Sequence, residues 1–186
     1  ILVSSTSAVA MQANIRCPAA SNTPMGAYEA YLETDEGARF SSGSGNENHW
    51  SGYHTYLDEN TESKTDSYAV AYMRTFSKGN GFISLDITTA AIQEVLANID
   101  NGEGSYVALF TPDHRVLTME DGSLVTTDLF EGSDVEERAL AAEETGNSYV
   151  NFNGKSYLLS VSPIGTTGMT VASIVPKATI LSAASG

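Results

Sequence analysis

The sequence has 186 residues and 41% of them are hydrophobic, which is enough to bury the core of one domain or of two small ones. There are 9 Lys and Arg against 23 Asp and Glu, a formal net charge of -14. The electric field of this negative charge repels phosphate backbones and anionic lipid headgroups. The composition therefore argues against nucleic-acid binding and against docking on a membrane through basic residues.

Cys17 is the only cysteine, so an intrachain disulfide and a multi-cysteine metal site are excluded. Its neighbours in the sequence suggest no histidine base, and we expect an incidental or structural role. No run approaches the roughly 18 apolar residues that would span a bilayer. The chain begins at Ile1 without the charged, apolar and cleavable regions of a signal peptide. We therefore expect an excised piece of a longer protein.

The first half predicts a helix followed by short strands. Apolar positions within residues 1–16 favour a leading helix that Pro18 would end. Residues 26–34 and 37–42 are typical of two strands around a turn. Residues 49–60 then bring aromatic and imidazole side chains close together in the sequence, namely His49, Trp50, Tyr53, His54 and Tyr56.

A strand that runs directly into a helix divides the sequence. Residues 68–76 alternate and predict one strand, and residues 77–80 predict a hairpin turn onto the next. In residues 81–87, the alternation places Ser84 and Asp86 on the face opposite three aliphatic residues. Apolar residues then recur at helical spacing up to Asn101, with Thr88 or Thr89 as the expected cap.

The second half predicts a helix, two strands, a helical connection and three antiparallel strands, an order typical of a PAS-like sheet. The strands are expected at residues 104–111, 115–119, 147–153, 155–164 and 169–175. Ser133 is the expected cap of a short helix over residues 134–145. Asn153 and Gly154 favour a two-residue hairpin turn, and a terminal helix is expected from residue 177. His114 is expected in an exposed turn.

Residues 79–176 resemble the double Cache extracytoplasmic sensor domains of bacterial chemoreceptors, sensor kinases and cyclic-dinucleotide enzymes. The resemblance rests on the segments GFISLDITTAAIQEVL, GSYVALFTPDHRVL and NSYVNFNGKSYLLSVSPIGTTGMTVASIVP. It implies an α+β fold of antiparallel PAS-like sheets with a leading N-terminal helix. It also implies two tandem modules: a membrane-distal one over residues 1–87 and a membrane-proximal one over residues 88–186.

The resemblance further implies transmembrane helices before Ile1 and after Gly186, an extracytoplasmic location at the plasma membrane, and a homodimer as an option for the full-length receptor. The distal half is shorter than in the family, which leaves a single Cache unit open. The motif of the amino-acid-binding subgroup, Arg-x-Trp-Tyr followed by Tyr-x-Asp, is absent, because the segment from His49 to Tyr53 has the aromatic residues without the arginine. Asp86 falls where that subgroup has its amine-binding carboxylate.

The predicted ligand-binding residues lie in the first half and are Trp50, Tyr53, Tyr68, Tyr72, Arg74 and Asp86. If the two strands pair symmetrically about residues 77–81, then Tyr72, Arg74, Ser84 and Asp86 project from one face. Arginine would offer a fork to a carboxylate, and aspartate a charged acceptor. The alternative is an Arg74–Asp86 ion pair on a solvent face, worth roughly 0 to 1 kcal/mol. A register slip of one residue would separate the two side chains.

The leading hypothesis is therefore a sensor module that is not an enzyme. It would bind a small molecule, an amino acid, amine or organic acid, in the distal module and pass a conformational change towards the membrane, with no catalytic residue, metal or cofactor. One alternative is a metal-assisted hydrolase that uses His49, His54 and the neighbouring Asp58 and Glu59. Another is a single Cache module that binds a protein partner.

Overall fold

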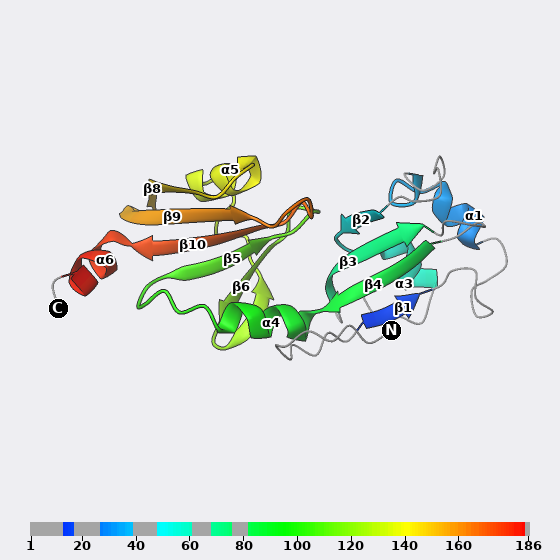
Figure 1. The fold of residues 1–186 in the computed structure, drawn as a ribbon, viewed down its shortest axis with the longest axis horizontal. Helices are drawn as coiled ribbons and strands as arrows, with labels where there is room; N and C mark the ends of the chain where they lie inside the picture. Colours follow the sequence, from blue (N-terminus) through cyan, green and yellow to red (C-terminus); the bar gives the residue numbers. More distant parts are fainter. Residues whose placement is uncertain (1–12, 17–26, 39–47, 61–67, 76–81, 185–186) are drawn as a thin grey trace. The chain divides into compact units, whose positions relative to one another are not determined.

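The computed structural model describes residues 13–16, 27–38, 48–60, 68–75 and 82–184 (Figure 1). The chain forms two compact units, residues 1–94 and 95–186, which we call the first and the second unit. Each unit contains one antiparallel sheet with short helices, so the predicted α+β class with antiparallel sheets is confirmed. No helix within the described ranges is long and apolar enough to cross a membrane.

The first unit has a four-stranded sheet in the order β1-β4-β3-β2. Its strands are β1 (Ala13–Arg16), β2 (Asn48–Ser51), β3 (Tyr68–Thr75) and β4 (Phe82–Thr88). Its short helices are α1 (Ala27–Leu32) and α3 (Thr55–Asn60). The helices and the sheet share a small buried core of Tyr31, Leu57, Met73 and Phe82.

Some of the elements predicted for the first unit are wrong. Ala13–Arg16, expected at the end of a leading helix, form β1, which pairs with β4; residues 1–12 of that expected helix lie outside the described residues. The expected strand over residues 26–34 contains α1 instead, because Ala, Glu and Leu favour a helix and Tyr31 becomes fully buried.

The second strand expected near that turn is also absent where the structure describes it. Gly37 and Ala38 donate their N–H groups to the Thr34 carbonyl and continue a turn. A Cβ at Gly37 would lie 2.0 Å from the carbonyl oxygen of Tyr31, so only glycine fits there.

The predicted passage from strand to helix in the middle of the chain is confirmed. β4 ends at Thr88 and α4 (Thr89–Ala97) follows without a loop. The Thr88 hydroxyl accepts a hydrogen bond from the N–H of Ala91 at 3.2 Å, which caps the first turn as expected.

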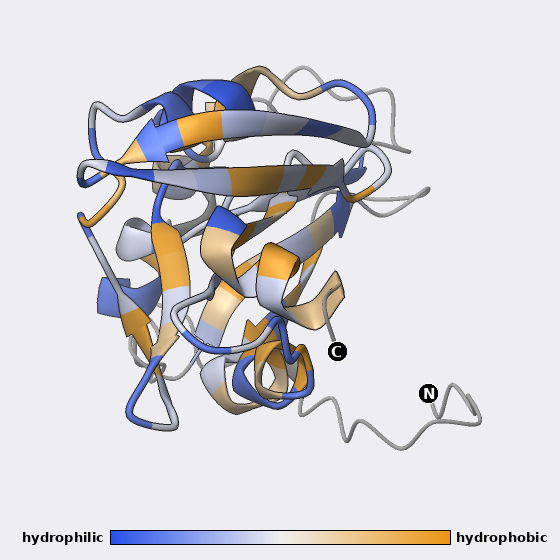
Figure 2. Ribbon diagram, turned by 90° about the vertical axis from the view of Figure 1, so that its left-hand side faces the viewer, coloured by the Kyte–Doolittle hydropathy of each residue, from blue (hydrophilic) through white to orange (hydrophobic). Residues whose placement is uncertain are grey.

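The second unit has a six-stranded sheet in the order β7-β6-β5-β10-β9-β8. Its strands are β5 (Tyr106–Phe110), β6 (Val116–Glu120), β7 (Ser123–Thr126), β8 (Gly146–Phe152), β9 (Lys155–Pro163) and β10 (Thr170–Pro176). Its helices after α4 are α5 (Asp134–Ala141) and α6 (Lys177–Ala184). Hydrophobic and hydrophilic residues are interspersed along the strands (Figure 2).

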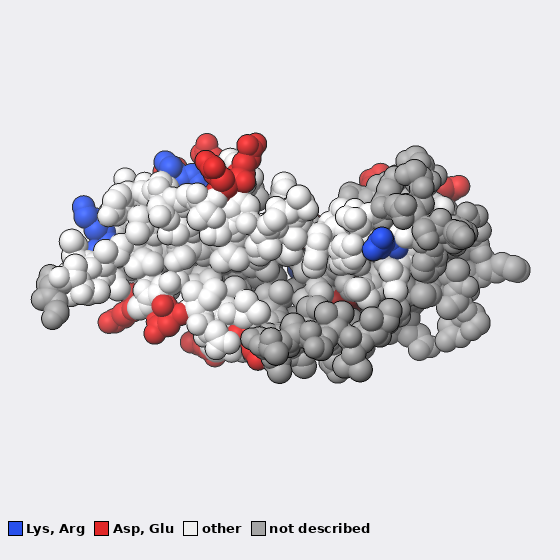
Figure 3. All heavy atoms as spheres, in the orientation of Figure 1, with Lys and Arg blue, Asp and Glu red and all other residues white. Residues whose placement is uncertain are grey.

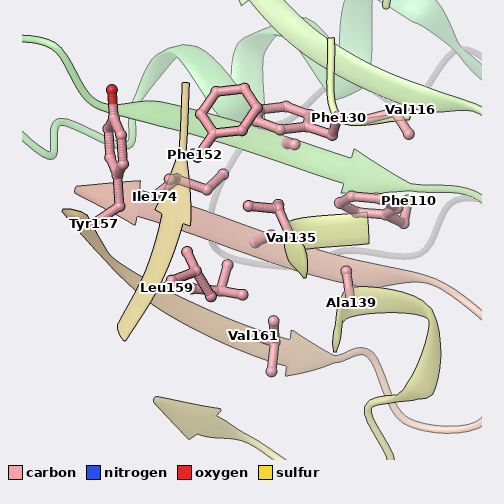
Figure 4. Packing of buried hydrophobic residues seen from close by; sticks show 13 residues of the cluster. Phe110, Val116, Phe130, Val135, Ala139, Phe152, Tyr157, Leu159, Val161 and Ile174 are labelled. Atoms are coloured by element: carbon pink, nitrogen blue, oxygen red, sulfur yellow. The ribbon is translucent and has the colours of Figure 1, made fainter. Parts of the chain in front are cut away.

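One face of this sheet carries a core of buried hydrophobic residues. Phe110, Phe130, Val135, Phe152 and Ile174 are among its buried members, contributed by strands, the β7–α5 connection and α5 (Figure 4). Ser133 caps α5 as predicted, because its hydroxyl accepts a hydrogen bond from the N–H of Glu136. Asp134, Glu136 and Glu137 follow in the first turn, and acidic side chains gather over this helix (Figure 3).

The predicted turn between β8 and β9 is also confirmed. Asn153 and Gly154 both have positive φ angles, 48° and 75°, which a two-residue hairpin of this type requires. The short strand β7 was not predicted, because its residues Ser123–Thr126 give only four positions of alternation.

Candidate ligand site

The register between β3 and β4 decides which predicted site residues share a face. Tyr72 pairs with Leu85, Met73 with Ser84 and Ala71 with Asp86. Directly paired residues project to the same side of an antiparallel sheet. Ser84 and Asp86 therefore lie on one face, while Tyr72 and Arg74 lie on the other.

The predicted common face of Tyr72, Arg74, Ser84 and Asp86 is thus wrong, since the pairing differs by one residue from the symmetric one. The apolar side chains explain the difference. The observed register places Met73 on the same face as Phe82, and both join the core with Tyr31 and Leu57. A shift of one residue would have moved Met73 to the opposite side from Phe82.

The face that α3 covers carries a buried polar cluster of His54, Asp58, Tyr68, Ser84 and Asp86. Their exposed fractions are 1%, 8%, 1%, 0% and 0%. Polar groups buried to this degree need hydrogen-bond partners, since an unsatisfied one costs several kcal/mol, on the order of 2–7. The hydrogen bonds within the cluster connect β3, β4 and α3.

Tyr68 is the centre of one half of the cluster. Its hydroxyl donates to Asp58 Oδ2 and accepts from the backbone N–H of His54, both at 2.7 Å. Its ring stacks on the imidazole of His54 at 6.1 Å and meets the ring of Tyr53 edge-on at 5.5 Å. Tyr68 pairs with Thr88 because the register shifts between Tyr68 and Val70, and this shift brings its side chain to the face of Asp86.

His54 and Ser84 form the other half. Ser84 Oγ donates to Asp86 Oδ1 at 3.3 Å, and His54 Nε2 lies 3.4 Å from Ser84 Oγ and 3.2 Å from Ser51 Oγ. The Ser84 hydroxyl therefore connects the imidazole of His54 with the carboxylate of Asp86.

Trp50, Tyr72 and Arg74 lie on the opposite face of the same sheet. Trp50 pairs with Tyr72 in the register of β2 and β3, and their rings lie 5.2 Å apart. Arg74 is exposed. Of the six predicted ligand-binding residues, Tyr53 and Tyr68 meet through their rings and Tyr68 shares a sheet face with Asp86, whereas the other three belong to the opposite face.

The carboxyl group of Glu36 lies near the carboxylates of α3. Burial raises the pKa of Glu36, partly offset by backbone hydrogen bonds from Tyr56 and Thr55, and the charges of Asp58 and Glu59 raise it further. Among the described residues, no group of three or more His, Cys, Asp or Glu side chains is placed to hold a metal ion.

Sequence reasoning missed His54, Asp58 and Ser84 as members of one site. A signal was present, because His54 and Asp58 are four residues apart and the N–H of Asp58 donates to the His54 carbonyl, as in a helical turn. Ser84 alternates with Asp86 on β4, so the two were expected on one face. The contact across the cluster depends on how α3 packs over the sheet.

Comparisons with solved structures show similarity of fold at low sequence identity. No protein-family model matches the sequence, and no curated protein matches it. The fold is similar to the extracellular domain of mmHK1S-Z2, a candidate histidine kinase, with 13% identity over 81% of this chain and 58% of that one and a TM-score of 0.53. The corresponding domain of rpHK1S-Z16 gives 14% identity, 78% and 60% coverage and a TM-score of 0.52.

A third similar structure is the ligand-binding domain of Mlp24 with asparagine, at 11% identity, 80% and 58% coverage and a TM-score of 0.52. The fold is that of a Cache-type sensor domain. The resemblance of the sequence to this family is thereby confirmed for the fold. The chain spans only about three fifths of the length of these three domains, between 58% and 60%.

Proposed function

We propose that the chain is the extracytoplasmic ligand-binding part of a bacterial transmembrane signalling receptor. The first unit acts as the membrane-distal module and binds a small molecule on the sheet face that α3 covers, at Asp86, Tyr68 and Tyr53. The second unit acts as the membrane-proximal module and passes the change towards the membrane. The fold shared with extracellular sensor domains supports this function, and so does the asparagine-bound state of Mlp24, although that ligand belongs to Mlp24.

The observation that carries the proposal is the buried polar cluster on β4. Polar residues at buried positions of a core strand lower the stability of the fold. Such residues are expected at functional sites. Ser84 and Asp86 are fully buried beside the apolar core residue Phe82. Hydroxyl groups, an imidazole and carboxylates in one place supply the few convergent polar groups that orient a ligand in a small-molecule site.

The same strand provides the route for the signal. Asp86 lies two residues before Thr88, whose hydroxyl caps α4, and α4 begins with no intervening loop. The sheet and α3 can be arranged in two ways relative to each other. A ligand that binds Asp86 in one of these arrangements favours it, and with it the corresponding position of the start of α4. The size of the response equals the difference in ligand affinity between the two arrangements.

A thermal-shift screen of the chain tests binding, with asparagine as the first probe and amino acids, amines and organic acids as the panel. A compound that binds only the folded state and is present at a hundredfold excess over its Kd stabilises it by about 2.7 kcal/mol. We expect Asp86→Asn to abolish the shift. Arg74→Gln, on the opposite face of the same sheet, is the matched control and should leave it intact. A panel without any stabilising compound contradicts the proposal.

Hydrogen exchange tests the transmission separately. Addition of a compound found in the screen should change the exchange of amides in α4, because the cap at Thr88 adjoins the site. Binding that leaves exchange in α4 unchanged would support a ligand-binding module but contradict this route.

A further inference from the structure

The connection between α4 and β5, residues 98–105, continues the last turn of α4. The N–H of Ile99 donates to the carbonyl of Leu96 at 3.1 Å, so the connection begins with a hydrogen bond to the helix itself. Further along, Asp100 Oδ1 accepts a hydrogen bond from the N–H of Gly102 at 2.9 Å. Because these hydrogen bonds hold the connection in one conformation, it moves with the end of α4 instead of absorbing a movement of that helix.

The connection contacts the first turn of α6. Thr179 Oγ1 donates to the carbonyl of Glu103 at 3.0 Å, across 76 positions of sequence. A Cβ at Gly102 would lie 3.0 Å from Thr179 Cγ2, and a Cβ at Gly104 would lie 3.3 Å from Cγ of Pro176, the residue before α6. Both glycines have positive φ angles, 85° and 75°. Only glycine therefore allows the connection and α6 to approach this closely.

Contacts at its first turn hold α6, and burial does not. None of the residues of α6, all of which the structure describes, is buried, and Leu181 is 57% exposed. α6 follows β10 directly, and Lys177 Nζ lies 5.6 Å from the centroid of the Tyr149 ring on β8. An isolated helix shorter than about 12 residues is marginal in water. The position and stability of α6 therefore depend on what its first turn contacts.

The connection also contains a buried hydrogen-bond donor without an acceptor. Asn101 Nδ2 is buried and has no hydrogen-bond partner among the described residues, although the carbonyl of Asn101 accepts from Ser105 Oγ at 2.8 Å. An unsatisfied buried donor raises the free energy of the arrangement that contains it. A second arrangement that gives this donor an acceptor or water is closer in free energy than it would be for a fully satisfied turn. Two arrangements of similar free energy are what a switching element requires.

On the basis of the function proposed above, we propose that the α4–β5 connection couples α4 to α6. The connection moves with the carboxyl end of α4, and its contacts with Thr179 and Pro176 transmit that movement to the first turn of α6. α6 is then the element of the second unit that responds to the signal. Gly102, Gly104 and Thr179 are positioning residues in this coupling.

A double-mutant cycle in the whole chain tests the contact and needs no ligand. Gly102→Ala adds a Cβ against Thr179 Cγ2, and Thr179→Ser removes that Cγ2 while it keeps the hydroxyl. Gly102→Ala should raise the hydrogen-exchange rates of the amides of residues 181–184, followed by NMR, about threefold or more, because in an α-helix these amides bond back to the first turn. In the Thr179→Ser background this increase should be absent.

Gly122→Ala is the matched control for backbone strain. Gly122 has a φ of 80°, close to that of Gly102, but a Cβ there would meet no described atom within 4 Å. This variant should change the exchange rates of residues 181–184 by less than about 1.5-fold, since it adds the same strain without a contact to α6. Circular dichroism and thermal unfolding confirm that each variant folds.

A substitution in α4 tests the transmission itself. Leu96 is 3% exposed in the last turn of α4, so Leu96→Ala should loosen that turn. We expect it to raise exchange in residues 181–184 about threefold or more, whereas Leu159→Ala, in the core on β9, should change it less than about twofold. Both variants lose the same buried side chain, so the difference between them measures the coupling and excludes a general loss of stability.

The outcomes separate this inference from the function on which it rests. If Gly102→Ala affects α6 no more than Gly122→Ala, or if Leu96→Ala affects it no more than Leu159→Ala, the coupling is wrong and the sensor function stands. If the variants behave as expected but no compound of the thermal-shift panel binds, the sensor function fails and the coupling stands as a property of the fold.

Discussion

Replacing Tyr68 by Phe tests the buried polar cluster, because it removes one oxygen atom and keeps the ring. That oxygen makes two hydrogen bonds of 2.7 Å, one to the carboxylate of Asp58 and one from the N–H of His54. A hydrogen bond to a charged group contributes about 1.5–3 kcal/mol and a neutral one about 0.5–1.5 kcal/mol. The substitution should therefore destabilise the first unit by about 2–4 kcal/mol, a large part of the roughly 5–15 kcal/mol that stabilises a typical domain.

Urea unfolding followed by tryptophan fluorescence measures this loss, since Trp50 is the only tryptophan and lies in the first unit. Tyr72→Phe is the matched control: the same change on the same strand, but on the half-buried opposite face. It should change the free energy of unfolding by less than about 0.5 kcal/mol. A Tyr68→Phe variant as stable as the control would refute the hydrogen bonds assigned to this hydroxyl, and with them the geometry of the site.

Three further predictions concern single groups. Ser133→Ala should destabilise the second unit by about 1 kcal/mol in thermal unfolding, because the hydroxyl caps α5, and Ser133→Asp should restore most of that loss. Burial raises the pKa of Glu36 above its ordinary value of 4.5, so stability from this group is present below pH 4.5 and lost as the pH rises through the higher folded-state value; Glu36→Gln should remove that pH dependence. Burial also acts to raise the pKa of Asp113, but hydrogen bonds from Arg115 and Thr111 outweigh it and hold the pKa below 3.8. Stability from Asp113 is thus present above pH 3.8 and lost as the pH falls through the lower folded-state value. When the free energy of unfolding is measured as a function of pH, Asp113→Asn should reduce its decrease at acid pH.

The second unit was largely predictable because its signals are local. Asn153-Gly154 fixes a turn through backbone conformation, and Ser133 caps a helix through its own hydroxyl. Neither depends on a partner far away in the sequence. The alternation of apolar and polar residues in β9 and β10 matches the burial of Leu159, Val161, Ala172 and Ile174. The face of these strands that packs on the core could therefore be predicted from the sequence.

The site in the first unit depends on contacts that the sequence does not encode locally. Alternation correctly put Ser84 and Asp86 on one face of β4, but it cannot fix the register with β3, and a difference of one residue moved Arg74 away from Asp86. The side chain of Tyr68 reaches the face of Asp86 because the register shifts between Tyr68 and Val70. The residue types on either side of Tyr68 do not indicate that shift. The six ligand-binding residues expected from the sequence stay a prediction, and the sheet separates Trp50, Tyr72 and Arg74 from Tyr68 and Asp86.

The position of β4 within its sheet restricts how a signal can leave the proposed site. β4 is an inner strand that pairs with β1 on one side and β3 on the other. A shift of β4 along its own axis would break backbone hydrogen bonds in both ladders and, at one residue, would turn Asp86 away from the cluster. The contacts of α3 with the sheet involve no backbone ladder: Leu57 packs in the core with Met73 and Phe82, and Tyr68 donates to Asp58. We therefore expect a ligand at Asp86 to change the packing of α3 against the sheet rather than the pairing of β4, and α4 to follow a movement of the sheet as a whole.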